Sequence, residues 1–215
     1  MSRILKITVC IAGLLSTPSL AEGSGFSAGL TGGSLGIGPQ VGYRVSEHFG
    51  LRADATFLSI SHGFDSDELN YDGKVKLRSV GAMLDLYPFG GGFRVSGGAR
   101  INGNKGRVEA TPATTVTIGD TDYAASAIGT LSGQAETKNF APALTLGYGG
   151  GSKQGLVFGV EAGALFQGRV RIRDFAASGG GVASADLESE RKSIQDDVDD
   201  FKVYPILQLT VAYRF

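Results

Sequence analysis

A period of two runs along most of the chain, and it limits the possible folds more strongly than any other feature of the sequence. Between Leu35 and Val45 the odd positions are apolar, aromatic or proline, whereas the even positions are glycine, glutamine and arginine. The segment 203–215 alternates in the same way up to the final Phe215. Successive side chains of a β-strand point to opposite faces, so this period is typical of strands with one apolar face.

The same alternation recurs in six further segments, which brings the number of expected strands to eight. The eight segments are 26–30, 35–45, 51–58, 79–86, 93–102, 140–148, 156–167 and 203–215. The sequence therefore predicts an all-β protein with an even number of strands.

Glycine accounts for 34 of the 215 residues. The glycines follow no Gly-X-Y period, which excludes collagen, and each would cost ~1 kcal/mol relative to alanine inside a helix. The formal net charge of −1 provides no excess of cations of the kind that nucleic-acid binding needs. We therefore expect few helices and no nucleic-acid partner.

The N-terminal residues have the three parts of a secretory signal peptide. Two cations precede the apolar run 7–15, and small residues precede the predicted cleavage site after Ala21. A run this short cannot replace the ~20 apolar residues that a helical membrane anchor requires. We predict a cleaved signal peptide, 1–21, and one mature domain, 22–215, which lacks the chain's single cysteine, Cys10.

Two all-β architectures could use such strands. In a soluble sandwich the apolar faces meet in a core and the polar faces contact water. In a membrane barrel the apolar faces contact lipid and the polar faces line the interior. The polar faces here consist mostly of glycine, alanine, serine and threonine with occasional charges. Residues this small fit inside a narrow barrel, whereas a solvated sandwich face would carry more lysine and glutamate.

The connections between the expected strands alternate in length, which also favours the membrane barrel. Outer-membrane barrels have short periplasmic turns and long extracellular loops. Short turns occupy 46–48, 90–92 and 149–155, and long hydrophilic segments occupy 62–73, 111–137 and 176–201. Aromatic residues gather beside the short turns, as in the girdle at a membrane interface. They are Tyr43, Phe49, Tyr87, Phe89, Phe93, Tyr148, Tyr213 and Phe215.

The chain ends on Val211-Ala212-Tyr213-Arg214-Phe215, which resembles the C-terminal signal of bacterial outer-membrane β-barrels. With the signal peptide and the eight strands, the chain resembles the small barrels of the OmpA, OmpX and OmpW kind. The segments 38–44 and 202–207 are similar to those of CarO-like outer-membrane proteins. The resemblance implies an eight-stranded antiparallel transmembrane β-barrel in the outer membrane of a Gram-negative bacterium.

The resemblance also implies partners and an orientation. The barrel assembly machinery would recognise the last strand through Tyr213 and Phe215, and outer-membrane lipid and lipopolysaccharide would surround a monomeric barrel. Placing Phe215 at the periplasmic edge puts the short turns in the periplasm and the long loops outside. Only the first hairpin, turning at 32–34, has a short exterior connection.

Charged residues on the polar faces predict a charge network inside the barrel. An eight-stranded barrel is just wide enough for side chains to fill, and an unpaired buried ion costs several kcal/mol. Asp85 and Arg94 flank one short turn and are the expected neighbours, and the alternative is a selective passage for small ions or amino acids. The predicted members are Arg44, Arg52, Asp54, Asp85, Arg94, Arg100, Glu161 and Arg214.

Three arginines, Arg169, Arg171 and Arg173, share the parity of the inward positions before them. We expect them to continue the inner face as a basic stripe at the barrel mouth. In the acidic segment 186–200 the apolar residues recur at near-helical spacing behind Ser184, a residue suited to an N-cap, which predicts an amphipathic helix in the last loop. This helix either folds over the mouth and pairs with the stripe or stays solvated without a partner.

Carboxylates crowd the segment 62–73 and could hold Ca²⁺. The EF-hand pattern fails because Leu69 stands where an oxygen ligand is required, so a solvated acidic loop is expected. Lys74, Lys76 and Arg78 follow directly, at a rim where lipopolysaccharide phosphates would lie.

No catalytic residue, cofactor or metal site is predicted. His62 has serine and aspartate nearby in sequence, but such residues are common in loops and spacing alone does not make a catalytic set. Gly36-Ile37-Gly38 continues into a strand rather than the helix that a nucleotide loop requires. We expect a non-enzymatic outer-membrane protein with a structural or surface-interaction role and a filled interior. A narrow channel or uptake porin for small solutes is the alternative that the CarO-like resemblance implies, and a lipid-modifying enzyme or protease is a third.

Overall fold

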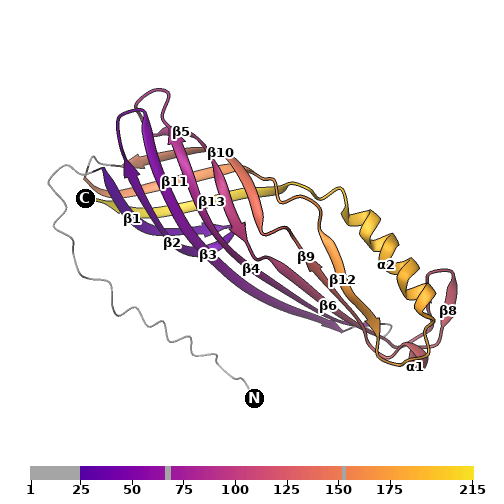
Figure 1. Cartoon of the computed structure of the whole chain (residues 1–215). Helices are drawn as coiled ribbons and strands as arrows, with labels where there is room; N and C mark the ends of the chain where they lie inside the picture. Colours follow the sequence, from indigo (N-terminus) through magenta and orange to yellow (C-terminus); the bar gives the residue numbers. More distant parts are fainter. Residues whose placement is uncertain (1–24, 66–68, 152–153) are drawn as a thin grey trace, which may run out of the picture.

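The structure, a computed structural model, describes residues 25–65, 69–151 and 154–215; the predicted signal peptide lies outside them. Among these residues, eight strands pair edge to edge in a closed antiparallel circuit (Figure 1). The circuit closes because the first strand pairs with both the second and the last. In order around the circuit, the strands are β1 (Phe26–Gly33), β2 (Gly36–Arg44), β3 (Phe49–Asp65), β4 (Leu69–Leu86), β5 (Phe93–Asn102), β10 (Phe140–Gly151), β11 (Gly155–Leu165) and β13 (Tyr204–Arg214). The predicted all-β antiparallel architecture is confirmed.

Side chains alternate between a buried and an exposed face along the circuit. On β13, Ile206 is 4% exposed and its neighbour Leu207 is 59% exposed. Gln208 and Thr210 are also buried, whereas Leu209 and Val211, which alternate with them, are not. Most buried positions of the ring therefore carry polar or small residues and most exposed positions carry large apolar ones, which is the reverse of a protein that folds in water.

The exposed apolar residues form one belt around the ring. A large apolar side chain loses about 1.5–3 kcal/mol when it stays in water instead of an apolar surrounding, so a belt of this size needs an apolar medium. We call this surface the apolar belt. It includes Leu30, Ile37, Val41, Leu51, Phe57, Val80, Leu84, Ile101, Leu144, Leu146, Phe158, Val160, Leu207, Leu209 and Val211.

One end of the ring carries the short turns and the C-terminus (Figure 1). Aromatic rings pack against each other there: Phe26 and Tyr213 lie 5.8 Å and 5.1 Å from Phe215 between ring centroids. Phe89 lies 6.0 Å from Phe93 beside the turn between β4 and β5. The aromatic residues thus mark this end of the barrel.

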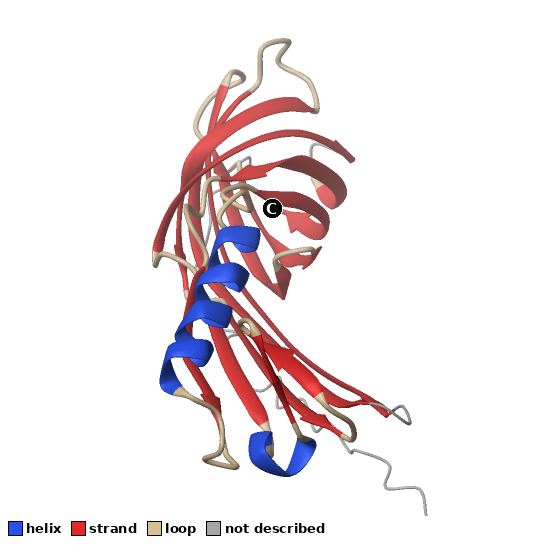
Figure 2. Ribbon diagram, turned by 90° about the vertical axis from the view of Figure 1, so that its right-hand side faces the viewer, coloured by secondary structure: helices blue, strands red, loops and turns tan. Residues whose placement is uncertain are grey.

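At the opposite end β3 and β4 continue far beyond the ring (Figures 1 and 2). Three strands add to the free side of β4 in the order β6 (Lys105–Pro112), β9 (Leu131–Glu136) and β12 (Arg171–Ala177). A small hairpin of β7 (Val116–Ile118) and β8 (Thr121–Tyr123) accompanies them, with the helices α1 (Ala125–Ile128) and α2 (Ser184–Val198). None of the helices in the described ranges is long and apolar enough to cross a membrane. We call the β4-β6-β9-β12 sheet, with the outer half of β3, the extension.

The extension corrects the expectation of long hydrophilic loops. The segments 62–73 and 111–137 contain the end of β3, the start of β4 and all of β7, β8 and β9. Their polar residues lie on strands with one solvated face, so hydrophilicity alone did not reveal them. Side chains of the carboxylates at 65, 67 and 68 lie outside the described residues.

The predicted helix in the last connection is confirmed as α2, although it runs along the extension instead of folding over the mouth of the ring. The residue at the N-cap is Ala183 and not Ser184, which is the first helical residue. Gln195 fastens α2 to β12, because its side-chain amide donates to the Val170 carbonyl at 2.7 Å and accepts from the Ile172 N–H at 2.9 Å. Figure 1 shows α2 running along β12 and beyond the ring.

Candidate functional site

The interior of the ring holds a network of buried ions from four strands. Arg52 on β3 contacts Glu161 on β11 at 2.6 Å and Asp85 on β4 at 3.2 Å. Arg94 on β5 donates to the same Glu161 at 2.9 Å. The Ser96 hydroxyl donates to Asp85 at 2.6 Å. Each of these ions has an oppositely charged partner, which meets the condition for burying charge.

A second buried pair lies beside this network. Arg100 on β5 binds Asp54 on β3 with both arms of its guanidinium, one of them at 3.0 Å, and its Nε donates to Ser79 at 2.7 Å. Side chains of both ions are 4% exposed. Bidentate pairing of this kind is strong and fixes the orientation of the guanidinium.

Two of these ion pairs, Arg100–Asp54 and Arg94–Glu161, are formed across a glycine on the intervening strand. Arg100 lies opposite Gly81 on β4, and Gly81 lies opposite Asp54 on β3. A Cβ atom on Gly81 would stand 2.6 Å from Nη1 of Arg100. The guanidinium therefore occupies the space that the missing side chain leaves, and so crosses a whole strand to reach its partner.

The same arrangement occurs in the ion network on the other side of β5. Arg94 lies opposite Gly147 on β10, which lies opposite Glu161 on β11. This register explains why the expected pairing of Asp85 with Arg94 is not observed. The Arg94 side chain crosses Gly147 and pairs with Glu161 on β11, whereas Asp85 pairs with Arg52.

An apolar layer lies beside the buried ions inside the ring. It consists of Leu35, Met83, Ala141, Ala143, Leu165 and Ile206, all buried, with Tyr204 packed against them. Leu35 was expected on the outer face. It turns inward because Gly36 adopts a φ of +100°, which breaks the two-residue phase at the first hairpin. A small cavity of about 10 Å³ lies between this layer and the buried ions.

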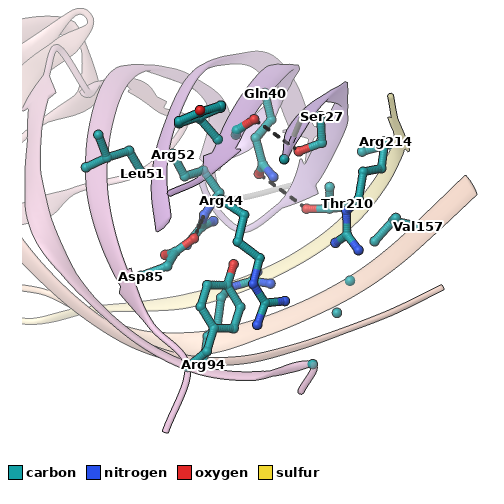
Figure 3. Close-up of a pocket in the computed structure, with 18 residues that line it drawn as sticks. Ser27, Gln40, Arg44, Leu51, Arg52, Asp85, Arg94, Val157, Thr210 and Arg214 are labelled. Atoms are coloured by element: carbon teal, nitrogen blue, oxygen red, sulfur yellow. Dashed lines mark hydrogen bonds and ion pairs between the residues drawn. The ribbon is translucent and has the colours of Figure 1, made fainter. Parts of the chain in front are cut away.

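One end of the interior is polar and contains a cavity of about 60 Å³ lined by Arg44, Arg94 and Arg214 among others (Figure 3). The Arg44 guanidinium lies 3.9 Å from the centre of the Tyr87 ring. It also donates to the carbonyls of Glu47 and Gly90 at 2.7 and 2.8 Å. Arg44 thus ties together two of the short turns at this end and does not join the ion network.

The structure places the predicted site residues in three groups. Six of them, Arg52, Asp54, Asp85, Arg94, Arg100 and Glu161, form the buried ion pairs. Arg44 and Arg214 line the end cavity. Tyr213 and Phe215 lie in the aromatic cluster at the C-terminus. The apolar layer was not predicted from the sequence. The inward parity of Met83, Leu165 and Ile206 is the signal that would have revealed it.

The basic stripe differs from its expected position. Between β11 and β12 the chain is irregular and Gly168 has a φ of +71°, so parity is not carried across this segment. Arg173 lies against Glu136 on β9 at 3.6 Å, and Arg169 contacts the end of α2 through Asp199 at 3.5 Å. The three arginines therefore do not continue the inner face, and α2 does not pair its acids with them as a group.

In the described part of the chain, no three side chains of histidine, cysteine, aspartate or glutamate gather as a metal site would require. His62 lies on β3 opposite Gly73 on β4, and its side chain is exposed. The chemistry that the interior offers is charge pairing.

Comparison with known structures identifies a similar fold. Acinetobacter baumannii CarO2 superposes with a TM-score of 0.64 at 19% identity, covering 88% of this chain and 98% of that chain. Acinetobacter baumannii CarO superposes with a TM-score of 0.62 at 19% identity, covering 88% and 97%. Comparisons with protein-family models and with curated proteins give no match. The resemblance to CarO-like outer-membrane proteins is confirmed at the level of the fold.

Proposed function

We propose that the chain is an eight-stranded transmembrane β-barrel of the outer membrane of a Gram-negative bacterium. The apolar belt supports this proposal, because only lipid would solvate so many large apolar side chains on the outside of a closed ring. The aromatic cluster at the C-terminal end supports a periplasmic interface there. In this orientation the short turns lie in the periplasm and the extension lies outside the cell.

We further propose a structural and surface-interaction role in which the barrel is a closed anchor and the extension is the working surface. One observation carries this proposal: the middle of the interior is filled by the buried ions and the apolar layer packed beside them. A hydrated solute that passed would have to separate ion pairs and displace packed apolar side chains. We assign the protein no catalytic role.

A narrow channel for small solutes is the second candidate. The observation in its favour is the polar end cavity of about 60 Å³, whose arginine Arg94 also belongs to the ion network. Rearrangement of Arg94 and Glu161 would then open a charged path through the middle of the barrel.

Swelling of proteoliposomes tests these two functions against each other. The mature protein is refolded into vesicles and exposed to an amino acid and to a monosaccharide. We expect vesicles that contain the native protein to swell no faster than protein-free vesicles, and we expect the same of vesicles that contain Arg94→Gln. Faster swelling with the native protein, altered by Arg94→Gln, would establish the channel instead.

A further inference from the structure

The extension has two unlike faces. One face is partly covered by α2 and the small hairpin, and Val108 and Ile172 of the sheet and Ile194 of α2 surround an apolar cavity of about 280 Å³. The other face continues the outer surface of the barrel, since Lys74 and Lys76 are in phase with the belt residue Val80 on the same strand. Above the apolar belt, the outer surface therefore changes from apolar to basic.

Six cations gather on this outer side of the extension. Strand register brings them together in two neighbouring rows that run across β4, β6, β9 and β12. We call them the cationic face, and they are Lys74, Lys76, Lys105, Arg107, Arg171 and Arg173.

Like charges stand directly opposite each other within these rows. Lys74 faces Arg107, and Lys76 faces Lys105, an arrangement that destabilises a sheet when nothing neutralises it. The carboxylate within the two rows, Glu136, is shared between Lys105 at 2.6 Å and Arg173 at 3.6 Å. In the portion of the chain that the structure describes, no ion pair joins Lys74 or Lys76 to a carboxylate. The face therefore carries excess positive charge.

The cations enclose a space suited to an anion. Lys74, Lys76, Lys105 and Arg107 line a cleft of about 350 Å³ on this face. Glu109 borders the cleft and contacts Arg107 at 3.2 Å. Lysine offers a mobile point charge and arginine a planar fork, and together they are the usual ligands of phosphate groups.

The height of the cleft above the apolar belt indicates where the anion comes from. The belt residue Phe57 stands opposite Arg78 on β4, and Lys76 lies two residues further toward the extension, or about 7 Å along the strand. Strands of membrane barrels tilt by about 35–45°, so the cleft lies about 5 Å above the edge of the belt. That is the depth of lipid head groups just outside the hydrocarbon core.

We propose that the cationic face binds the phosphate groups of lipopolysaccharide in the outer leaflet. The proposal rests on the proposed outer-membrane orientation and adds a lipid ligand to it. Phosphate oxygens neutralise the opposed pairs Lys74–Arg107 and Lys76–Lys105, and the acyl chains of the same molecule pack on the apolar belt below. Bound lipid thus fixes the extension relative to the membrane surface.

Native mass spectrometry of the refolded mature protein with purified lipid A tests the proposal. The lipid is supplied either with both phosphates or dephosphorylated, and inorganic phosphate is added separately as a competitor. The test variant is Lys74→Gln/Lys76→Gln. The matched control, Lys192→Gln/Lys202→Gln, removes the same charge from exposed lysines elsewhere on the extracellular side. Heat-modifiable mobility on SDS gels verifies the closed barrel in every sample.

We expect the native protein and the control variant to retain phosphorylated lipid A, and the test variant to bind it at least about tenfold more weakly, since each cation near an anionic surface contributes about 1 kcal/mol. Equal retention by both variants, or retention of dephosphorylated lipid A, would overturn the site. Displacement by equimolar inorganic phosphate would overturn lipid as its ligand. Loss of heat-modifiable mobility in the native protein would overturn the proposed membrane barrel and the lipid site together.

Discussion

Two residues in the interior show how a missing side chain can organise charge. Gly81 and Gly147 each lie between an arginine and a carboxylate on flanking strands. Neighbouring strands are about 4.8 Å apart, so a guanidinium that crosses one strand needs the space above its backbone. The inward position of these glycines is visible in the sequence, but their alignment opposite Arg100 and Arg94 depends on register, which the sequence pattern does not specify.

Substitution of Gly81 tests this role of glycine. We expect Gly81→Ala to destabilise the barrel by about 1–3 kcal/mol, the usual range for overpacking, because the added methyl group displaces Arg100 from Asp54. Gly97→Ala is the matched control, since a Cβ atom on Gly97 meets nothing within 4 Å. Urea unfolding followed by circular dichroism suits a chain without tryptophan. Equal midpoints for both variants would contradict this account of Gly81.

At the scale of elements, strands with a strict two-residue period were predictable and the extension was not. On β4 the apolar belt ends at Val80, yet the strand continues through Lys74 and Lys76 to Leu69. Alternation between charged and small residues resembles a loop when only hydrophobicity is considered. Positive-φ glycines at Gly36 and Gly168 also shift the phase of the alternation, so Leu35 and the basic stripe lie elsewhere than parity alone suggests.

The pairing of β6 with β9 is expected to depend on pH through Glu136. A hydrogen bond from Lys105 holds the pKa of Glu136 below its ordinary value near 4.5. A carboxyl whose pKa falls on folding stabilises the fold above its unfolded pKa, and this contribution is lost as the pH falls through the folded pKa. The β6–β9 edge should therefore be unaffected between neutral pH and about 4.5 and loosen below it.

Hydrogen exchange of the β9 amides measures this effect. Comparison of the native protein with Glu136→Gln at each pH removes the intrinsic pH dependence of exchange. We expect the β9 amides to be better protected from exchange in the native protein than in Glu136→Gln at neutral pH. In acid we expect the two proteins to be equally protected. The control Glu188→Gln on α2 should follow the native protein, because Glu188 is paired with Arg191. Identical exchange of the native protein and Glu136→Gln at neutral pH would show that the contact contributes nothing.

At the scale of the whole molecule, the apolar belt and the filled interior both follow from the alternation of residues around the closed ring. The sequence predicted which positions face inward, because parity on β13, β10 and β3 survives into the structure. It did not predict which ions pair, since Arg52 and Glu161 are brought together by closure of the ring across strands distant in sequence. The apolar layer likewise arises from residues on several strands that meet only after closure.

Single-channel recording in planar bilayers tests the closed interior most directly. The ion network and the apolar layer predict that the purified mature protein, inserted and heat-modifiable, produces no discrete conductance steps at any applied potential the bilayer withstands. Reproducible steps from the native protein, absent from protein-free bilayers and altered by Arg52→Gln, would contradict the account and establish a conducting barrel.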